Sequence, residues 1–162
     1  MLLAAAGCDG PAEELDLSHT YSSLPEVREA SSAAVLFTTT SDGQRTEGER
    51  DLPFTVTTAV VVATDGRDDL DPGEKIDIRQ MEGRFTNIAP ALDLDESYVA
   101  YLKPWTSSVP DNIDGEGQLV IVGGQSVWRV QGSTGRRTTP DSQLPDRVTV
   151  ASVDGLLSVT AS

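Results

Sequence analysis

The chain has 162 residues, which is enough for one domain with a hydrophobic core and too few to expect two. Its 26 acidic residues outnumber its 12 basic ones, and the formal net charge of −14 disfavours nucleic acid and anionic lipid surfaces as partners, because both would repel it. No apolar run approaches the roughly 20 residues that a membrane-spanning helix needs. The single cysteine excludes an internal disulfide and a thiolate zinc cluster, since each requires several sulfur atoms.

That cysteine, Cys8, directly follows a run of small residues. Ala6-Gly7-Cys8 resembles the bacterial lipobox, although Ala5 stands where leucine is usual. The resemblance implies that residues 1–8 are a signal-peptide remnant with its lipobox and that Cys8 carries a lipid. The protein would then be extracytoplasmic and attached to the cell membrane by this lipid anchor. The alternative is an apolar start with a free cysteine.

Residues 9–21 are small, acidic or Pro/Gly, which is typical of a flexible tether. The only histidine, His19, lies there, and we expect it to be solvated, because a catalytic base needs a rigid setting. Ser23 and Glu26 then have the spacing of a capping box, which predicts a short helix ending near Ala30.

The first half of the remaining chain reads as strands separated by polar connections. Residues 33–40 predict a strand that ends at a turn over Ser41-Asp42-Gly43, and a polar loop over residues 44–52 separates it from a long strand over residues 54–63. Strict alternation over residues 74–79 predicts a half-exposed strand with Ile76 and Ile78 inward. Its outward residues would be Lys75, Asp77 and Arg79.

Residues 83–94 then form a connection that we expect to cover the mouth of a barrel. The next strands are predicted over residues 98–103 and 119–130, the latter folded into a pair at Gly123-Gly124. Tyr101 and Trp128 fit core positions. Residues 132–146 read as a loop, and residues 148–159 as a final hairpin, with a helix starting at Asp154 as the alternative.

The order of these elements resembles a group of functionally uncharacterised secreted or lipid-anchored proteins of Gram-positive bacteria. The resemblance covers residues 20–131 and includes four segments. They are Tyr21-Ser22-Ser23-Leu24 with Glu26, then Ile78-Arg79-Gln80, and finally residues 95–102 together with residues 121–130. The strand order is also similar to the small five-stranded barrels of the OB and netrin-like kind, which bind partners on an open face or through loops. No catalytic residue is carried over.

We therefore expect a mainly β fold, a small closed or partly open antiparallel β-barrel over residues 22–162 with one short N-terminal helix. Its expected function is to bind an unknown envelope protein or ligand without catalysis, and we assign no catalytic residue, metal or cofactor. One alternative is a hydrolase whose carboxylate pair is drawn from five candidates: Asp93, Asp95, Glu96, Asp111 and Asp114. The other is a calcium-stabilised domain using residues 65–71 or 111–116, although a solvated acidic turn is favoured over a calcium site at residues 65–71.

Overall fold

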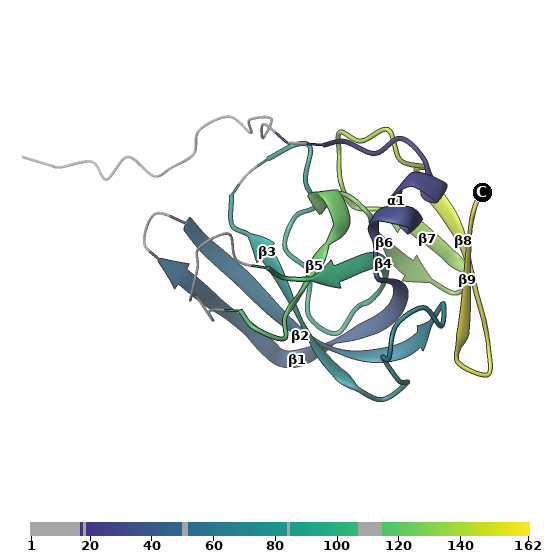
Figure 1. Ribbon diagram of the computed structural model, residues 1–162, viewed down its shortest axis with the longest axis horizontal. Coiled ribbons are helices and arrows are strands. Elements are labelled where there is room, and N and C mark those ends of the chain that lie inside the picture. Colours follow the sequence, from purple (N-terminus) through teal and green to yellow (C-terminus); the bar gives the residue numbers. More distant parts are fainter. Residues whose placement is uncertain (1–16, 18, 50–51, 84, 107–114) are drawn as a thin grey trace, which may run out of the picture.

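The structure is a computed structural model, and it describes residues 17, 19–49, 52–83, 85–106 and 115–162. These residues form mainly β structure with one α-helix (Figure 1). The elements in chain order are α1 (Leu24–Ala30), β1 (Ala33–Glu49), β2 (Leu52–Thr64), β3 (Lys75–Met81), β4 (Ser97–Pro104), β5 (Leu119–Ile121), the 3-10 turn η1 (Val122–Gly124), β6 (Val127–Gln131), β7 (Thr134–Arg137), β8 (Arg147–Val153) and β9 (Leu156–Ala161). The helix is too short and too polar to cross a bilayer, and the described residues hold no other that could.

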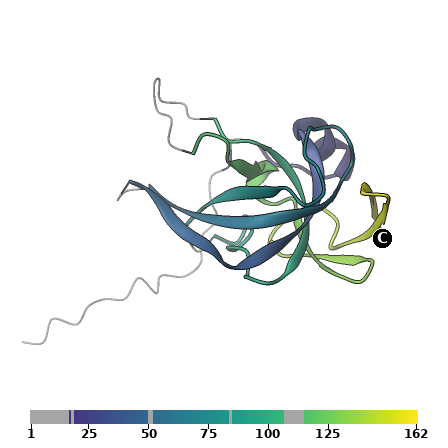
Figure 2. The ribbon, with the colours of Figure 1, turned by 90° about the horizontal axis from the view of Figure 1, so that it is seen from below.

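All nine strands belong to one sheet, in the order β1-β2-β3-β5-β4-β6-β7-β8-β9. Because β1 also pairs with β4, the strands β1, β2, β3, β5 and β4 close into a ring. The strands β6 to β9 continue the sheet from β4, and β9 returns to touch β2 at a single position, Thr64 with Leu156. The long β1–β2 pair extends from one side of the molecule and the β8–β9 hairpin lies at the other (Figures 1 and 2). The predicted mainly β class is confirmed.

Two hydrophobic cores lie on opposite faces of β1 and β4. In β1, Val35 and Phe37 point into the first core, inside the ring, whereas Ala34 points into the second. In β4, Leu102 belongs to the first core and Tyr101 to the second. The two strands therefore form a wall buried on both faces, and the second core is covered by α1 and the strands β6 to β9.

The turn predicted at Ser41-Asp42-Gly43 is wrong, and so is the loop predicted over residues 44–52 in the part that the structure describes, residues 44–49 and 52. The strand β1 runs on to Glu49, and its pairing with β2 only shifts in register between Thr39 and Gln44. A β-bulge of this kind absorbs extra residues without ending a strand. The polar residues of the predicted loop pair with residues of β2 in the sheet. A hydropathy pattern read along one segment does not reveal such a partner.

The hairpin predicted at Gly123-Gly124 is also wrong. The strands β5 and β6 do not pair with each other, because both pair with the same edge of β4, one after the other. The turn η1 links them, with φ angles of +64° at Gly123 and +68° at Gly124 that favour glycine. The region 132–146, predicted to be a loop throughout, contains the short strand β7, which pairs with β6 and β8.

The predicted helix and the predicted final hairpin are confirmed. The Oγ atom of Ser23 accepts a hydrogen bond from the amide of Glu26 at 3.4 Å, and the Glu26 carboxylate accepts one from the amide of Ser22 at 2.9 Å. The strands β8 and β9 are joined by Asp154 and Gly155, which both have positive φ angles, as a tight hairpin turn requires. The alternative helix starting at Asp154 is therefore wrong.

Two leucine-to-alanine substitutions, one inside the first core and one outside it, test whether β1 and β4 form a wall buried on both faces. Leu102 is 1% exposed inside the ring, whereas Leu156 is 59% exposed at the start of β9. We expect Leu102→Ala to lower the free energy of unfolding by about 2–5 kcal/mol, because it leaves a cavity. Leu156→Ala is expected to change it by less than about 0.5 kcal/mol. Urea denaturation measures both free energies of unfolding, and equal losses for the two variants would contradict the buried position of Leu102.

Candidate functional site

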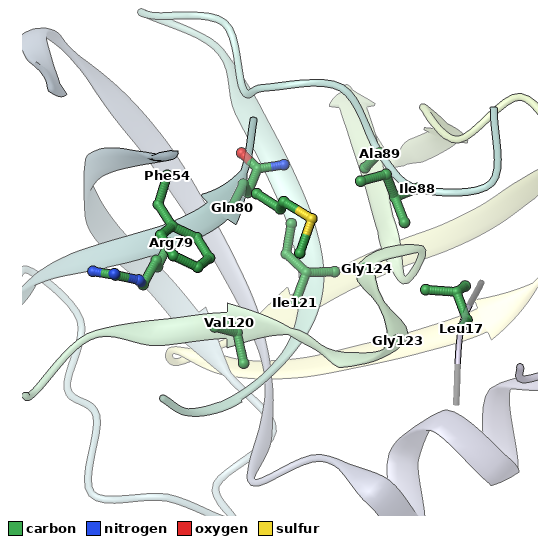
Figure 3. Close-up of a pocket in the computed structure, with 11 residues that line it drawn as sticks. Leu17, Phe54, Arg79, Gln80, Ile88, Ala89, Val120, Ile121, Gly123 and Gly124 are labelled. Atoms are coloured by element: carbon green, nitrogen blue, oxygen red, sulfur yellow. The ribbon is translucent and has the colours of Figure 1, made fainter. Parts of the chain in front are cut away.

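An apolar pocket lies where β3 and β5 separate. Their parallel pairing ends at Arg79 with Val120, after which β3 continues to Met81 while β5 turns into η1. The resulting gap has a volume of about 190 Å³. Figure 3 shows its lining side chains, which come from five separate segments. They are Leu17 before the helix, Phe54 of β2, Arg79, Gln80 and Met81 of β3, Ile88 and Ala89 of the connection before β4, and Val120, Ile121, Gly123 and Gly124 around η1.

The two glycines of η1 are required by close packing as well as by their φ angles. A Cβ atom on Gly123 would lie 2.9 Å from the ring of Tyr21, and one on Gly124 would lie 3.0 Å from Cγ2 of Ile88. The carbonyl of Gly124 accepts a hydrogen bond from the amide of Ala89 at 2.7 Å. The glycine pair therefore lets the segment before α1 and the connection before β4 approach the pocket rim.

Glutamine side chains hold the connection over the first core. Gln80 donates to the carbonyl of Pro90 at 3.1 Å and accepts from the amide of Leu92 at 3.2 Å. Gln125 donates to the carbonyl of Asn87 at 2.7 Å. These side chains satisfy backbone groups that a strand partner would otherwise serve. Leu92 packs into the first core, in agreement with the predicted covering role of this connection.

The pocket wall contains a buried arginine that the sequence pattern places in solvent. Arg79 is only 4% exposed, so the prediction that it is half-exposed is wrong, although it does point outward from the ring. Its guanidinium lies 4.0 Å from the ring centre of Phe54 and 4.9 Å from that of Trp105. Its Nη1 atom donates to Glu47 at 3.2 Å and to Gln118 at 3.1 Å.

The physical reason is that this outer face is covered. The register places Arg79 beside Val56 and away from the ring interior, as the alternation predicts, but residues beyond β4 fold over it. A Cβ atom on Gly115 would lie 2.6 Å from the Trp105 ring and 3.0 Å from Nη1 of Arg79. Trp105 directly after Pro104 was the one available signal, since a large aromatic side chain at a strand end must be buried somewhere.

A polar network balances the charge of this arginine. Glu47 accepts hydrogen bonds from Gln118 at 2.8 Å and from Arg45 at 2.8 Å, in addition to the one from Arg79. The Gln118 amide and the Arg45 guanidinium hold the pKa of the Glu47 carboxyl below its ordinary value. Arg45 also pairs with Asp77 at 3.2 Å, so charged groups of β1 and β3 flank β2 on its outer face.

The pocket itself offers an apolar surface. The guanidinium of Arg79 points away from Gly123 and Leu17, so the aliphatic stem faces the gap (Figure 3). An engineered cavity of about 150 Å³ with aliphatic and aromatic walls stays dry and binds benzene. A volume of about 190 Å³ therefore suits one aromatic ring or a short branched chain.

The carboxylates considered for hydrolysis do not gather at this pocket. Asp93 and Glu96 both contact the guanidinium of Arg129, Glu96 at 3.8 Å. Asp95 occupies a left-handed conformation with φ of +57°, as a turn residue before β4. Asp111 and Asp114 lie outside the described residues, as does Cys8.

The other residues considered for chemistry have structural surroundings. Asp65 of the acidic loop pairs with Arg67 at 2.6 Å, and within the described ranges no three His, Cys, Asp or Glu side chains gather as a metal site would need. His19 is exposed and lies edge-on to Tyr21 at 4.5 Å between ring centres. The Ser126 hydroxyl is buried and donates to the carbonyl of Val122 at 2.9 Å.

No protein-family model, curated protein or solved structure matches the chain. The fold and the pocket thus define its class: a mainly β protein whose single sheet closes into a ring and which has an apolar pocket between β3 and β5. What the pocket binds has to be argued from its own chemistry.

Exchanging arginines for lysines tests the buried position of Arg79. Lysine lacks the planar guanidinium that packs against the rings of Phe54 and Trp105, so Arg79→Lys is expected to lower the free energy of unfolding by about 1–3 kcal/mol. The matched exchange Arg45→Lys, on a side chain 45% exposed, should cost less than about 1 kcal/mol. Chemical denaturation measures both values, and equal small losses would show that Arg79 is not buried.

The pH dependence of stability tests the network around Glu47. Because its pKa is lowered on folding, the ionised carboxylate stabilises the protein above the unfolded pKa of about 4.3, and this contribution is lost as the pH falls through the folded pKa. The difference in unfolding free energy between the wild type and Glu47→Gln should therefore be largest above about pH 5 and shrink in acid. Glu29→Gln, on the exposed face of α1, is the control. A difference that does not change with pH would contradict the network.

Proposed function

We propose that the protein is a non-enzymatic binding domain whose pocket takes up an apolar group of its ligand. The observation that carries the proposal is the pocket between β3, β5 and the connection before β4, which is lined mainly by apolar groups from segments far apart in the sequence. Concave apolar sites with few polar groups are the usual form of a ligand site. The volume of about 190 Å³ is below that of a drug-sized site, so the pocket would hold one part of a ligand.

The ligand would insert an aromatic ring or a branched aliphatic chain and leave its polar part outside. Leu17 and Ile88 form one rim and Phe54 the other, so an inserted group is in contact with hydrocarbon on both sides (Figure 3). Complete burial of such a group contributes about 1.5–3 kcal/mol to the free energy of binding. This is only part of the binding free energy of a specific complex. The acidic surface of the chain favours a neutral or cationic group outside the pocket.

We further propose that the ring is a small barrel of the OB or netrin-like kind. Five strands closed through the β1–β4 pairing, with a connection between β3 and β4 packed on the interior core, support this architecture. Barrels of this kind bind on the face of their second and third strands or through loops. Phe54 and Arg79, on β2 and β3, place one pocket wall at that face.

The remaining part of the proposal concerns location. The Ala6-Gly7-Cys8 sequence supports a lipid at Cys8 and an extracytoplasmic domain carried on an acidic tether. The resemblance of residues 20–131 to secreted or lipid-anchored proteins of Gram-positive bacteria supports an extracytoplasmic location. We expect mass spectrometry of the native protein to find Cys8 as an acylated N-terminal residue. An unmodified Cys8 in a cytosolic polypeptide would contradict the anchor and leave the pocket proposal intact.

Titration with benzene and toluene, followed by the methyl NMR signals of Ile88 and Ile121, tests the pocket. We expect saturable shifts at these methyl groups, because the probes match the volume of the gap. Ala89→Leu should weaken binding about tenfold by filling the gap. The matched exchange Ala151→Leu, at an exposed position of β8, should leave binding unchanged.

The pocket variants also need a control for folding. Thermal melting should show that Ala89→Leu remains folded, and Leu17→Ala provides a second variant at the rim, where it removes one lining side chain. Leu17→Ala is expected to change the affinity for toluene without changing the melting midpoint of the free protein. An absence of shifts at the pocket methyl groups of the wild type would contradict the proposal.

A further inference from the structure

A groove runs between α1 and the last strand, β9. Two adjoining hollows of about 380 and 330 Å³ share Arg28, Tyr101 and Val159. One wall is the helix, through Leu24, Pro25, Arg28 and Glu29, and the other is five consecutive residues of β9, residues 156–160. The buried ring of Tyr101 forms the floor, and burial raises the pKa of its hydroxyl, which stays neutral.

The backbone of β9 faces this groove with unused hydrogen-bonding groups. Directly opposite residues of an antiparallel pair either exchange both hydrogen bonds or none. The amide of Ser162 donates to the carbonyl of Arg147, which fixes the alternation along β8 and β9. Val150, opposite Val159, instead donates its amide to Ser133 on the far side of β8. The N–H and C=O groups of Val159 therefore point away from β8.

Nothing in the described part of the chain takes up these groups. The only pairing of β9 besides β8 is the contact of Leu156 with Thr64, at the end of the groove. Beyond that point the amides of Val159 and Ala161 have no hydrogen-bond partner among the described residues. The groove thus contains an open strand edge about four residues long.

This edge carries none of the residue types or bulges that usually protect a strand edge against strand addition. Free edges are normally blunted by lysine, proline, inward charges or bulges. Residues 156–162 contain no charged residue and no proline in a chain with 38 charged side chains, and the β8–β9 register has no shift. An edge left flat and neutral, between a helix and an aromatic floor, has the form of sites that bind an added peptide strand.

Charge in the groove indicates what the added strand should carry. Arg28, which lines both hollows, forms no ion pair with any described residue, whereas Arg67 beside it is paired with Asp65. The carboxylate of Glu29 lines only one of the two hollows, so Arg28 alone offers a charged group to both. A second copy of this chain is a poor occupant, because each copy has a net charge of −14.

We propose that β9 accepts an extended segment of a different polypeptide in this groove. The segment would pair with the amide and carbonyl of Val159, direct alternate apolar side chains onto Tyr101 and Leu24, and place a carboxylate at Arg28. This interface is separate from the apolar pocket, so that its failure would leave the pocket proposal standing.

The test uses immobilised synthetic dodecapeptides that alternate Val, Ile, Leu or Phe with Thr or Ser and end in Asp, Gln or Lys. We expect the Asp-terminated peptides to bind best. Val159→Pro removes the outward amide without removing a β8–β9 hydrogen bond, and it should weaken binding about tenfold. The matched Val159→Ala retains the amide and should weaken binding by less than about threefold. Arg28→Gln should abolish the preference for Asp over Gln.

Hydrogen exchange on the wild type keeps the result independent of any folding defect in Val159→Pro. Adding the best peptide should slow exchange at the amides of Val159 and Ala161 and leave Thr160, which already faces β8, unchanged. An absence of binding, or equal affinities of Val159→Pro and Val159→Ala, would overturn the proposal. A concentration-dependent dimer that Val159→Pro abolishes would also overturn it, by assigning the edge to a second copy.

Discussion

The structure depends on a strand that is buried on both faces and hydrogen-bonded on both edges. The strand β4 pairs with β1 on one edge and with β5 and then β6 on the other. Residues 98–102 are all buried, which requires an apolar side chain at every position instead of every second one. Closure of the ring on one side and the layer of β6 to β9 on the other both start from this strand.

The pocket and the groove both follow from places where pairing around that wall stops. The strand β5 is only three residues long, so β3 loses its partner after Arg79, and the pocket opens at that point. The strand β9 keeps its pairing with β8 but meets β2 at one position only, so the rest of its edge remains open. The buried guanidinium of Arg79 packs against the rings of Phe54 and Trp105, which stiffens the wall of the first site without placing its charge in the cavity.

The sequence was informative wherever local pattern and tertiary structure agree. Ser23 and Glu26 predicted the helix, alternation over Ile76 and Ile78 predicted an inward face, and Asp154-Gly155 predicted the last turn. Predictions were wrong where one sequence pattern is compatible with two different local structures. Glycine with a positive φ angle occurs both in a hairpin turn and in a bend between two strands that pair with the same edge of a third strand. A run of polar residues occurs both in loops and in paired strands that face solvent. The site was missed for a related reason, because burial of Arg79 depends on Trp105 and Gly115, which are distant in sequence.

The central claim is that the gap beside η1 is an apolar binding pocket in the folded protein. A crystal of the protein pressurised with xenon tests it most directly, since xenon enters dry apolar cavities. We expect a xenon peak in contact with Ile88, Ile121 and the stem of Arg79. A pocket filled by hydrogen-bonded water, or closed by its own side chains with no xenon bound, would contradict it.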